Sequence, residues 1–286
     1  MRTVMALLLI VSLTGNVVLA GVVGIGIVTN ETFSGIARKA AKYFRLPPIG
    51  GRWTANRDYQ SVQPCRLNES VVVLVLGQSN GANAAFSYRR AADADARAFW
   101  SGSCYGLSDP IIGGDGQRGS QWPMFADLFK ASLGRSVTIV SAGWGGTQIE
   151  DWSRRGYDRA ALAQIGALAA LGRKVDAVFW QQGESDYATD PATYRERFGV
   201  VMNRLREAGV TAPVFVAQST LSADHRNEPL RSLQAELGRQ PGFAPGPDAD
   251  TVTERFDGYH FTAEGTDKMA KLWVDAVTAC NCLARD

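Results

Sequence analysis

The chain has 286 residues, 45% hydrophobic and 20% charged, which is ordinary for a globular protein and enough for one sizeable α/β domain. The formal net charge is only +2 and no run of five basic residues occurs, which argues against a nucleic-acid partner. With two histidines, and no His-x-x-x-His or Cys-x-x-Cys pair, we expect neither a catalytic metal nor another cofactor.

The amino terminus is almost wholly apolar over residues 4–28, and it carries no charge between Arg2 and Glu31. About 20 apolar residues suffice to cross a bilayer as a helix. We therefore predict an uncleaved signal anchor, that is, a transmembrane helix, over residues 1–30. A signal peptide cleaved after Ala20 is the alternative.

A basic amphipathic segment follows at residues 31–46, and it suits either an anionic membrane surface or a solvated linker helix. Its positive charges count against export under the positive-inside rule. An even number of cysteines argues the other way, because exported proteins often carry disulfides; the four are Cys65, Cys104, Cys280 and Cys282. We expect a membrane-anchored domain outside the cytoplasm, or a secreted one if the amino-terminal segment is cleaved.

Pairing of Cys65 with Cys104 would tie the segment before the first strand to the long loop after it. Cys280 and Cys282 are separated by one residue and would form a strained pair with each other. Other pairings stay open at this point.

The domain itself is predicted over residues 70–286, after a proline- and glycine-containing linker and lead-in at 31–69. Its first strand is predicted at 71–76, where six consecutive aliphatic residues indicate a strand buried on both faces. Residues 81–120 are rich in Gly, Ala, Ser and Asp and have weak periodicity. They predict a long loop over the functional site.

Strands and helices then alternate to the end of the chain. Helices are predicted over 121–133, 158–171, 191–208, 228–239 and 262–278, and strands over 136–140, 176–180, 213–217 and, as a short or extended piece, near 250–256. This alternation implies right-handed crossovers and an α/β fold with a parallel sheet. The polar or small residues that end each strand would then gather on one edge of that sheet.

Ser79 follows the first strand at this edge, where open α/β sheets bind their ligands, and is a candidate nucleophile. The alternative is a serine that caps the next helix. His260 is the candidate general base, and Asp257, three residues before it, is the candidate partner that orients its ring. His225 is the rival base, and otherwise a residue of the surface or of a substrate loop.

Acyl transfer also needs donors to a developing oxyanion. The candidates are the backbone N–H groups of Ser79 and of Gly145 or Gly146, and the side-chain amide of Gln182. Candidate substrate-binding residues beside them are Gln78, Asn80, Trp144 and Glu184.

Two alternatives concern the residues after the third strand and the aromatic residues near the clusters. Glu184 and Asp186 fit a structural role better than a glycosidase acid pair, although two such carboxylates on an extended segment point the same way. Aromatic residues in or beside the clusters either stack on sugar rings or belong to the core; they are Trp144, Trp152, Trp180 and Tyr187.

Four ordered blocks of the chain resemble the SGNH-hydrolase superfamily, and in particular its sialate O-acetylesterase and acetyl xylan esterase-like carbohydrate esterases. The blocks are Gly77–Asn80, Gly145–Trp152, Trp180–Asp186 and Asp257–Phe261, and residues Arg231 to Gln234 also look like that branch. The resemblance covers roughly residues 70–278.

This resemblance implies a three-layer α/β/α sandwich and removal of acetyl groups from carbohydrate through an acyl-serine intermediate. Carried over by position, Ser79 is the nucleophile, His260 the base and Asp257 its partner. The wider superfamily has Gly-x-Asn-Asp where this chain has Gly183-Glu184-Ser185-Asp186. The third oxyanion donor therefore moves to Gln182, beside Gly145 or Gly146.

The expected partner is an acetylated carbohydrate substrate, together with a membrane reached through the amino-terminal helix. Two alternative functions use the same fold. One is a polysaccharide O-acetyltransferase that passes the acyl group to a sugar, and the other is a non-catalytic glycan-binding protein.

Overall fold

The computed structural model describes residues 62–283. The anchor predicted at 1–30 and the basic segment at 31–46 lie outside these residues. Within residues 62–283, no helix is long and apolar enough to cross a membrane. The predicted lead-in at 31–69 contains, near its end, the short strand β1, which pairs with β4.

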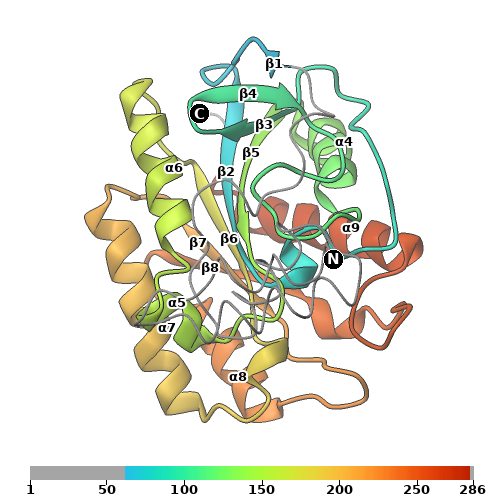
Figure 1. Ribbon diagram of the computed structural model, residues 1–286, viewed down its shortest axis with the longest axis vertical. Helices are drawn as coiled ribbons and strands as arrows, with labels where there is room; N and C mark the ends of the chain where they lie inside the picture. The colour runs from blue at the N-terminus through green and yellow to red at the C-terminus, as the bar shows by residue number, and fades with distance from the viewer. Residues whose placement is uncertain (1–61, 284–286) are drawn as a thin grey trace, which may run out of the picture. The chain divides into compact units, whose positions relative to one another are not determined.

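The described part of the chain forms an eight-stranded sheet in the order β1-β4-β3-β5-β2-β6-β7-β8 (Figure 1). The strands are β1 (Val62–Gln63), β2 (Ser70–Gly77), β3 (Arg97–Trp100), β4 (Ser103–Gly106), β5 (Ser136–Gly143), β6 (Ala177–Gln181), β7 (Val214–Gln218) and β8 (Phe243–Asp248). All neighbours from β3 to β8 pair parallel, whereas β4 is antiparallel to both of its neighbours. The predicted mostly parallel sheet is confirmed.

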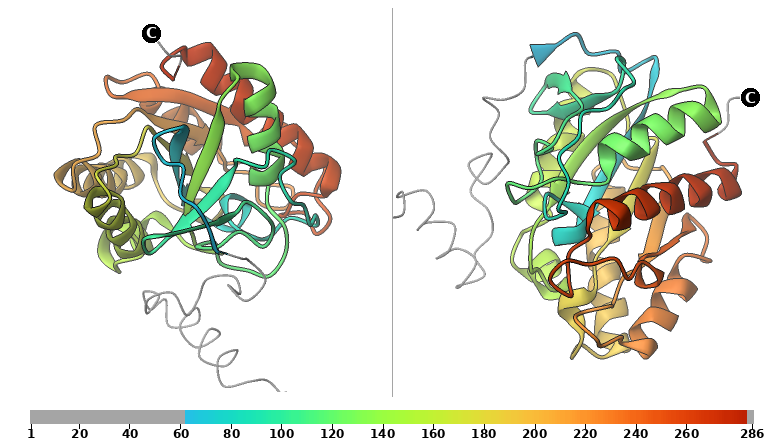
Figure 2. Two further views of the ribbon diagram at one scale, coloured as in Figure 1. Left: turned by 90° about the horizontal axis from the view of Figure 1, so that it is seen from above. Right: turned by 90° about the vertical axis from the view of Figure 1, so that its right-hand side faces the viewer.

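Helices cover both faces of this sheet (Figure 2). They are α4 (Trp122–Leu133), α5 (Ile149–Arg154), α6 (Arg159–Ala170), α7 (Pro191–Glu207), α8 (Glu228–Leu237) and α9 (Ala263–Cys280). Helices α4 and α9 pack together on one face, and α5 to α8 cover the other. Helix α4 ends at the predicted Gly134, whose φ of 68° is a left-handed conformation that glycine adopts without a steric penalty.

Strand β2 lies at the centre of the sheet, and its side chains explain the two layers of core. Alternate residues of a strand point to opposite faces. Val71, Val73 and Val75 join the apolar cluster under α4 and α9, while the side chains between them join the cluster under α5 to α8. Each of these side chains is fully buried, and each such burial stabilises the fold by about 1.5–3 kcal/mol.

The region 81–120, predicted as one long loop, contains the hairpin of β3 and β4. The two strands are joined by Ser101 and Gly102, which have φ values of 49° and 82°. Positive φ at both turn residues is the geometry that matches the twist of a two-residue hairpin. Weak periodicity around the hairpin hid this signal from the sequence analysis.

The strand predicted near 250–256 is wrong in position, because β8 lies at Phe243–Asp248 and residues 249–251 form a short 3-10 helix. Pro245, Gly246 and Pro247 give β8 a composition that does not resemble a strand. Prolines are tolerated there because β8 is the last strand of the sheet order. The short helix α5 was also not predicted.

Two disulfides join the four cysteines, Cys65 with Cys104 and Cys280 with Cys282. The first bridge is one of the pairings that the sequence left open. It ties the chain ahead of β2 to β4, across a sequence separation of 39 residues, and Cys104 is fully buried.

We expect Cys65→Ser to lower the free energy of unfolding by up to about 4 kcal/mol, the chain-entropy value for a loop of this length. The matched control is Cys282→Ser, which opens a bridge with a sequence separation of only 2 and should cost much less. Urea unfolding of the two variants measures the difference. Equal losses would show that the long loop is not what the first bridge constrains.

Candidate active site

Ser79 begins the short 3-10 helix η3 (Ser79–Gly81) at the carboxyl end of β2. The preceding turn requires glycine at position 77, where φ is +152° and an added Cβ would lie 2.0 Å from the carbonyl oxygen of Gln181. The N-cap of η3 is Gln78, so Ser79 does not cap this helix, and its side chain is partly exposed. The turn therefore presents the serine at the sheet edge.

The second part of the site is the loop that carries Asp257 and His260. The Asp257 Oδ2 atom lies 2.6 Å from the His260 Nδ1 atom. Asp257 Oδ1 accepts hydrogen bonds from the backbone N–H groups of Tyr259 and His260, at 2.9 and 2.7 Å. Partial burial alone would raise the pKa of Asp257, but these hydrogen bonds outweigh it and lower the pKa. The carboxylate stays ionised and fixes the histidine ring.

Asn80 connects the serine turn to the histidine loop. Its Nδ2 atom donates to the carbonyl oxygen of Tyr259 at 3.0 Å and to Glu184 Oε1 at 2.9 Å. Because Asn80 follows Ser79 and Tyr259 precedes His260, the residues predicted as nucleophile and base belong to segments in direct contact.

Arg255 holds the histidine loop through hydrogen bonds to two of its backbone carbonyls. Its Nη1 atom donates to the same Tyr259 carbonyl at 2.6 Å, and its Nη2 atom donates to the carbonyl of Ala249. Its guanidinium also lies 4.7 Å from the centre of the Phe261 ring. Burial lowers the pKa of Arg255, although the Glu184 carboxylate opposes this effect. The arginine therefore anchors the loop from both ends.

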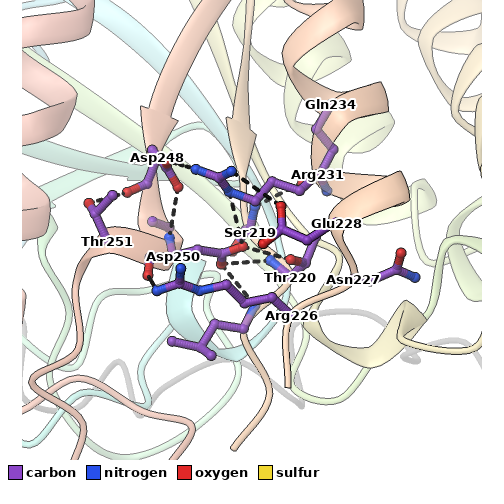
Figure 3. Close-up of polar contacts among 12 residues, drawn as sticks. Ser219, Thr220, Arg226, Asn227, Glu228, Arg231, Gln234, Asp248, Asp250 and Thr251 are labelled. Carbon is purple, nitrogen blue, oxygen red and sulfur yellow. Dashed lines mark hydrogen bonds and ion pairs between the residues drawn. The ribbon is translucent and has the colours of Figure 1, made fainter. Parts of the chain in front are cut away.

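A buried polar cluster holds the start of this loop against the end of β7 (Figure 3). The fully buried Asp250 accepts hydrogen bonds from the backbone N–H groups of Thr220 and Leu221, both at 2.8 Å, and from the Thr220 hydroxyl. Arg226 donates to the Asp250 carbonyl at 2.7 Å. Beside this cluster and the histidine loop lies an open pocket of about 570 Å³, lined by residues that include Arg226, Arg255 and Gly258.

The segment Arg231 to Gln234 on α8 serves the same scaffold. Arg231 pairs with Asp248 at the end of β8 (Figure 3). The Gln234 amide accepts from the Ser219 N–H at 2.9 Å and donates to the Gln182 carbonyl at 2.8 Å. This helix therefore fixes the ends of β6, β7 and β8 relative to one another.

The structure places the Gln182 side chain beneath the site, fully buried. Its Nε2 atom donates to Thr147 O at 3.0 Å and to Asp186 Oδ2 at 2.5 Å, with Gln78 Oε1 at 3.4 Å. Both amide hydrogens are thus used within the protein. This geometry does not support the predicted oxyanion role, because Gln182 instead joins the loops after β2, β5 and β6.

Gly145 lies directly beside Ser79, since a Cβ added to Gly145 would be 3.8 Å from the Ser79 Cβ. The Gly145 N–H donates to Asp115 Oδ2 at 3.2 Å, so a carboxylate from the 81–120 region reaches the predicted oxyanion position. Gly146 follows in an exposed turn with φ of 68°. The structure thus brings Gly145 to the serine, and it adds Asp115, which the sequence analysis missed.

The predicted substrate-binding residues are all buried: Gln78, Asn80, Trp144 and Glu184 are each 5% exposed or less. Gln78 Oε1 accepts from the N–H groups of Gly183 and Ser185, both at 3.2 Å, and Trp144 packs against Tyr157. These side chains pack within the loops around Ser79, and their contact with a sugar stays a prediction. Trp152 and Trp180 are core residues, whereas Tyr187 is exposed.

Neither acid of the glycosidase alternative faces a substrate. Asp186 is fully buried and accepts from the Ile149 N–H at 2.9 Å and the Thr189 hydroxyl at 2.7 Å. Burial raises the pKa of both Glu184 and Asp186. Each carboxyl group has its own set of internal partners, so the two do not form an acid pair across a sugar site.

His225, the rival base, lies in an exposed turn in which its backbone exchanges two hydrogen bonds with that of Ser222. No hydrogen bond or ion pair connects the His225 ring to another described residue. Within residues 62–283, no group of three or more His, Cys, Asp and Glu side chains is arranged to hold a metal ion.

A serine turn and an Asp–His pair, joined at the carboxyl edge of a parallel sheet, are typical of a hydrolase that uses a serine nucleophile. Comparison with protein families identifies residues 119–279, more than half of the chain, as a carbohydrate esterase, sialic acid-specific acetylesterase domain. The chain belongs to this family, and it is a carboxylic ester hydrolase that acts on acetylated carbohydrate. The matched residues include Gly145, Asp257 and His260, but they begin after Ser79.

One solved structure agrees on the fold with a TM-score above 0.5. A protein from Arabidopsis thaliana aligns with a TM-score of 0.63 and 18% identity, over 73% of this chain and 98% of that protein. A carbohydrate acetylesterase from Xanthomonas citri aligns with a TM-score of 0.49 and 21% identity, over 72% of this chain and 55% of that one. Est24, a carbohydrate acetylesterase from Sinorhizobium meliloti, aligns with a TM-score of 0.44 and 14% identity, over 74% of this chain and 100% of that one. No curated protein sequence matches this chain significantly.

The buried Glu184 gives a test of this scaffold. Burial raises the pKa of Glu184 above its ordinary 4.5, so the folded protein keeps a proton that the unfolded chain has released. Stability should therefore fall as pH rises from about 4.5 through the raised pKa, because the folded state binds more protons in that window. The variant Glu184→Gln keeps a side-chain oxygen that can accept the Asn80 hydrogen bond, but it has no carboxyl group to titrate.

We expect the free energy of unfolding of Glu184→Gln, measured relative to that of wild type, to increase between pH 4.5 and pH 8, by about 1.4 kcal/mol for each pH unit between 4.5 and the raised pKa of Glu184. Urea unfolding across this range measures it. A difference that stays constant with pH would contradict the assignment of a buried, titrating carboxyl group.

Proposed function

We propose that Ser79 is the nucleophile, His260 the general base and Asp257 its orienting partner in the removal of O-acetyl groups from sugars. The observation that carries the proposal is the contact of the serine turn with the histidine loop, made by the Asn80 amide and the Tyr259 carbonyl at 3.0 Å. Asp257 holds His260 Nδ1, which leaves Nε2 as the ring nitrogen that accepts the serine proton.

In the first half of the reaction, Ser79 Oγ attacks the acetyl carbonyl carbon while His260 Nε2 takes the serine proton. The acetyl oxygen gains negative charge and accepts hydrogen bonds from the N–H groups of Ser79 and Gly145. For this, the Gly145 N–H exchanges the Asp115 carboxylate for the substrate oxygen. The bond between the acetyl carbon and the sugar oxygen then breaks, and His260 gives its proton to that oxygen.

In the second half, a water molecule attacks the acetyl-Ser79 ester while His260 takes a proton from the water. The serine ester bond breaks, the proton returns to Ser79 Oγ, and acetate leaves. One acetylated sugar and one water are consumed, and one sugar hydroxyl and one acetic acid form, the acid then ionising to acetate and a proton. His260 acts as base and acid in turn, which requires the fixed ring orientation that Asp257 provides.

The two histidines of the chain form a matched pair for the test. Ser79→Ala and His260→Ala should each lower kcat for acetate release by about 10³-fold or more, because each removes a member of the nucleophilic unit. His225→Ala should stay within about twofold of wild type. Release of p-nitrophenol from its acetate ester, with thermal unfolding to verify folding, measures these effects.

Wild-type rates in Ser79→Ala, or a His225→Ala variant as inactive as His260→Ala, would contradict the assignment. Acetate release from acetylated saccharides should be compared with acetyl transfer to an added saccharide. Predominant transfer would favour the acetyltransferase alternative, and binding of an acetylated polysaccharide without release of acetate would favour the glycan-binding one.

We also propose that the catalytic domain is exported and that residues 1–30 anchor it to a membrane or direct its secretion. Two disulfides support this proposal, because such bridges persist in oxidising compartments outside the cytoplasm. The apolar run at residues 4–28 supplies the export signal in this account.

A fusion of the full chain to alkaline phosphatase, which becomes active only after export, should be active in a bacterial host. Deletion of residues 4–28 should abolish that activity. Equal activity with and without the deletion would overturn the proposal. Sedimentation of the active fusion with membranes distinguishes a retained anchor from a cleaved signal.

A further inference from the structure

An exposed arginine and two exposed phenylalanines form a cluster beside the histidine loop, and the mechanism uses none of them. The Arg118 guanidinium carbon lies 5.6 Å from the centre of the Phe86 ring and 5.0 Å from that of Phe256. The two rings are 5.6 Å apart, and the Phe256 ring is 6.0 Å from that of His260. We name this set, Phe86, Arg118 and Phe256, the rim cluster.

The rings of the rim cluster are unusually accessible for their size. Phe86 is 60% exposed and Phe256 is 40% exposed, and Tyr259, whose ring lies 6.3 Å from that of His260, is 46% exposed. A neighbouring group of exposed aromatic side chains forgoes the stability that burial gives, and such groups mark binding surfaces. Aromatic faces suit the C–H faces of pyranose rings.

The Arg118 guanidinium has five N–H donors. Among the described residues, its side chain forms no ion pair and no hydrogen bond, and its contacts are the two phenyl rings. Two carboxylates belong to neighbouring residues of the cluster, Asp115 three residues before Arg118 and Asp257 next to Phe256, and both have other partners. Asp115 accepts from the N–H groups of Gly116 and Gly145, and Asp257 accepts from His260. Within residues 62–283, no carboxylate therefore neutralises the positive charge of Arg118.

The backbone under the rim cluster is tied to the catalytic loop. The Phe86 N–H donates to the Phe261 carbonyl at 2.9 Å, and the Phe256 N–H donates to the His260 carbonyl at 3.0 Å. Ala85 and Gly119 exchange two hydrogen bonds of 3.0 Å, one residue away from Phe86 and Arg118. The cluster is thus pre-organised at a fixed position relative to His260, which reduces the entropy cost of binding.

We propose that the rim cluster is a subsite for a carboxylate-bearing pyranose, in which Arg118 binds the carboxylate and the phenylalanine rings stack on the sugar. A planar guanidinium forms two parallel hydrogen bonds with a carboxylate, and stacking on aromatic rings holds it in the required orientation. The carboxylate belongs either to a uronic acid next to the acetylated unit or to an acetylated sialic acid itself. This inference rests on the proposed catalytic role of His260.

The test compares substrates that differ only in the carboxylate. One pair is an acetylated oligosaccharide that bears a uronic acid and the same compound with its carboxyl reduced to hydroxymethyl. The other pair is O-acetylated N-acetylneuraminic acid and its carboxyl-reduced form. For each pair, kcat/KM for acetate release from the acid is divided by that from the reduced compound. In wild type this ratio should exceed one for at least one pair. The pair with the higher ratio shows whether the carboxylate belongs to a uronic acid or to a sialic acid.

Arg118→Ala should lower that ratio by about tenfold or more, the loss expected for a charge-assisted hydrogen bond. The control is Arg239→Ala, an exposed arginine beyond α8, which should keep the wild-type ratio. Phe86→Ala should lower kcat/KM for both members of the pair, because stacking does not depend on charge. A wild-type ratio near one in both pairs, or an Arg118→Ala variant that weakens acid and reduced substrates equally, would overturn the subsite.

Failure of the catalytic proposal has a different signature. If wild type hydrolyses p-nitrophenyl acetate no faster than Ser79→Ala, the proposed nucleophile is wrong. The subsite is then judged by calorimetric binding of the acidic and reduced sugars to wild type and to Arg118→Ala, which requires no catalysis. Tighter binding of the acid that depends on Arg118 would support the subsite even in that case, and its absence would reject it.

Discussion

The side-chain amide of Asn80 donates to two acceptors that come from different loops, the Glu184 carboxyl group and the Tyr259 carbonyl. These two bonds fix the serine turn against the loop after β6 and the loop that carries His260. A hydroxyl and an imidazole on separate loops react together only if their separation is held to a fraction of an ångström. The remaining polar contacts of the site keep the acceptors of Asn80 in position.

Several of these supporting contacts are buried, and burial increases both their strength and the cost of losing a partner. Glu184 and Asp250 both lie in the interior. Burial raises the pKa of Glu184. The Asp250 carboxylate, in contrast, accepts hydrogen bonds from two backbone N–H groups and one hydroxyl. A hydrogen bond in a low-dielectric interior is stronger, and an unpaired group there is more costly, than the same group in water. Arg255 lowers the cost of the Glu184 charge and holds the Tyr259 carbonyl at the same time. The scaffold is therefore cooperative, so that loss of one member weakens several loops.

The fold could be predicted from sequence wherever apolar residues recur in long runs. Strand β2 and the helices from α4 to α9, except the short α5, occur close to their predicted positions for this reason. The β3–β4 hairpin was missed because a turn of two residues, Ser101 and Gly102, gives a weak signal in a region of weak periodicity. Strand β8 was missed because its prolines are acceptable only at an edge, and edge position is a property of the whole sheet.

Prediction of the site followed the same division. Short-range pairs such as Asp257 and His260 could be read from spacing, because three residues bring a carboxylate to a ring nitrogen within one turn. The contacts of Gln182 could not be read from spacing. Whether its amide hydrogens point to the site or to the interior depends on acceptors in other loops, here Thr147 and Asp186.

The rim cluster shows why substrate specificity is harder to predict than chemistry. Phe86, Arg118 and Phe256 come from distant parts of the chain and form no spacing pattern. Backbone bonds between residues 85 and 119, 86 and 261, and 256 and 260 hold their segments together. The four motif blocks, by contrast, supply buried residues that hold the catalytic groups, and these must stay constant for any acetylated sugar. Recognition of a particular sugar is thus left to exposed side chains on loops, which can change without disturbing the buried network. In this protein the region between β2 and α4 supplies Phe86, Arg118 and Asp115, and it is therefore the part of the chain in which substrate preference is most readily altered.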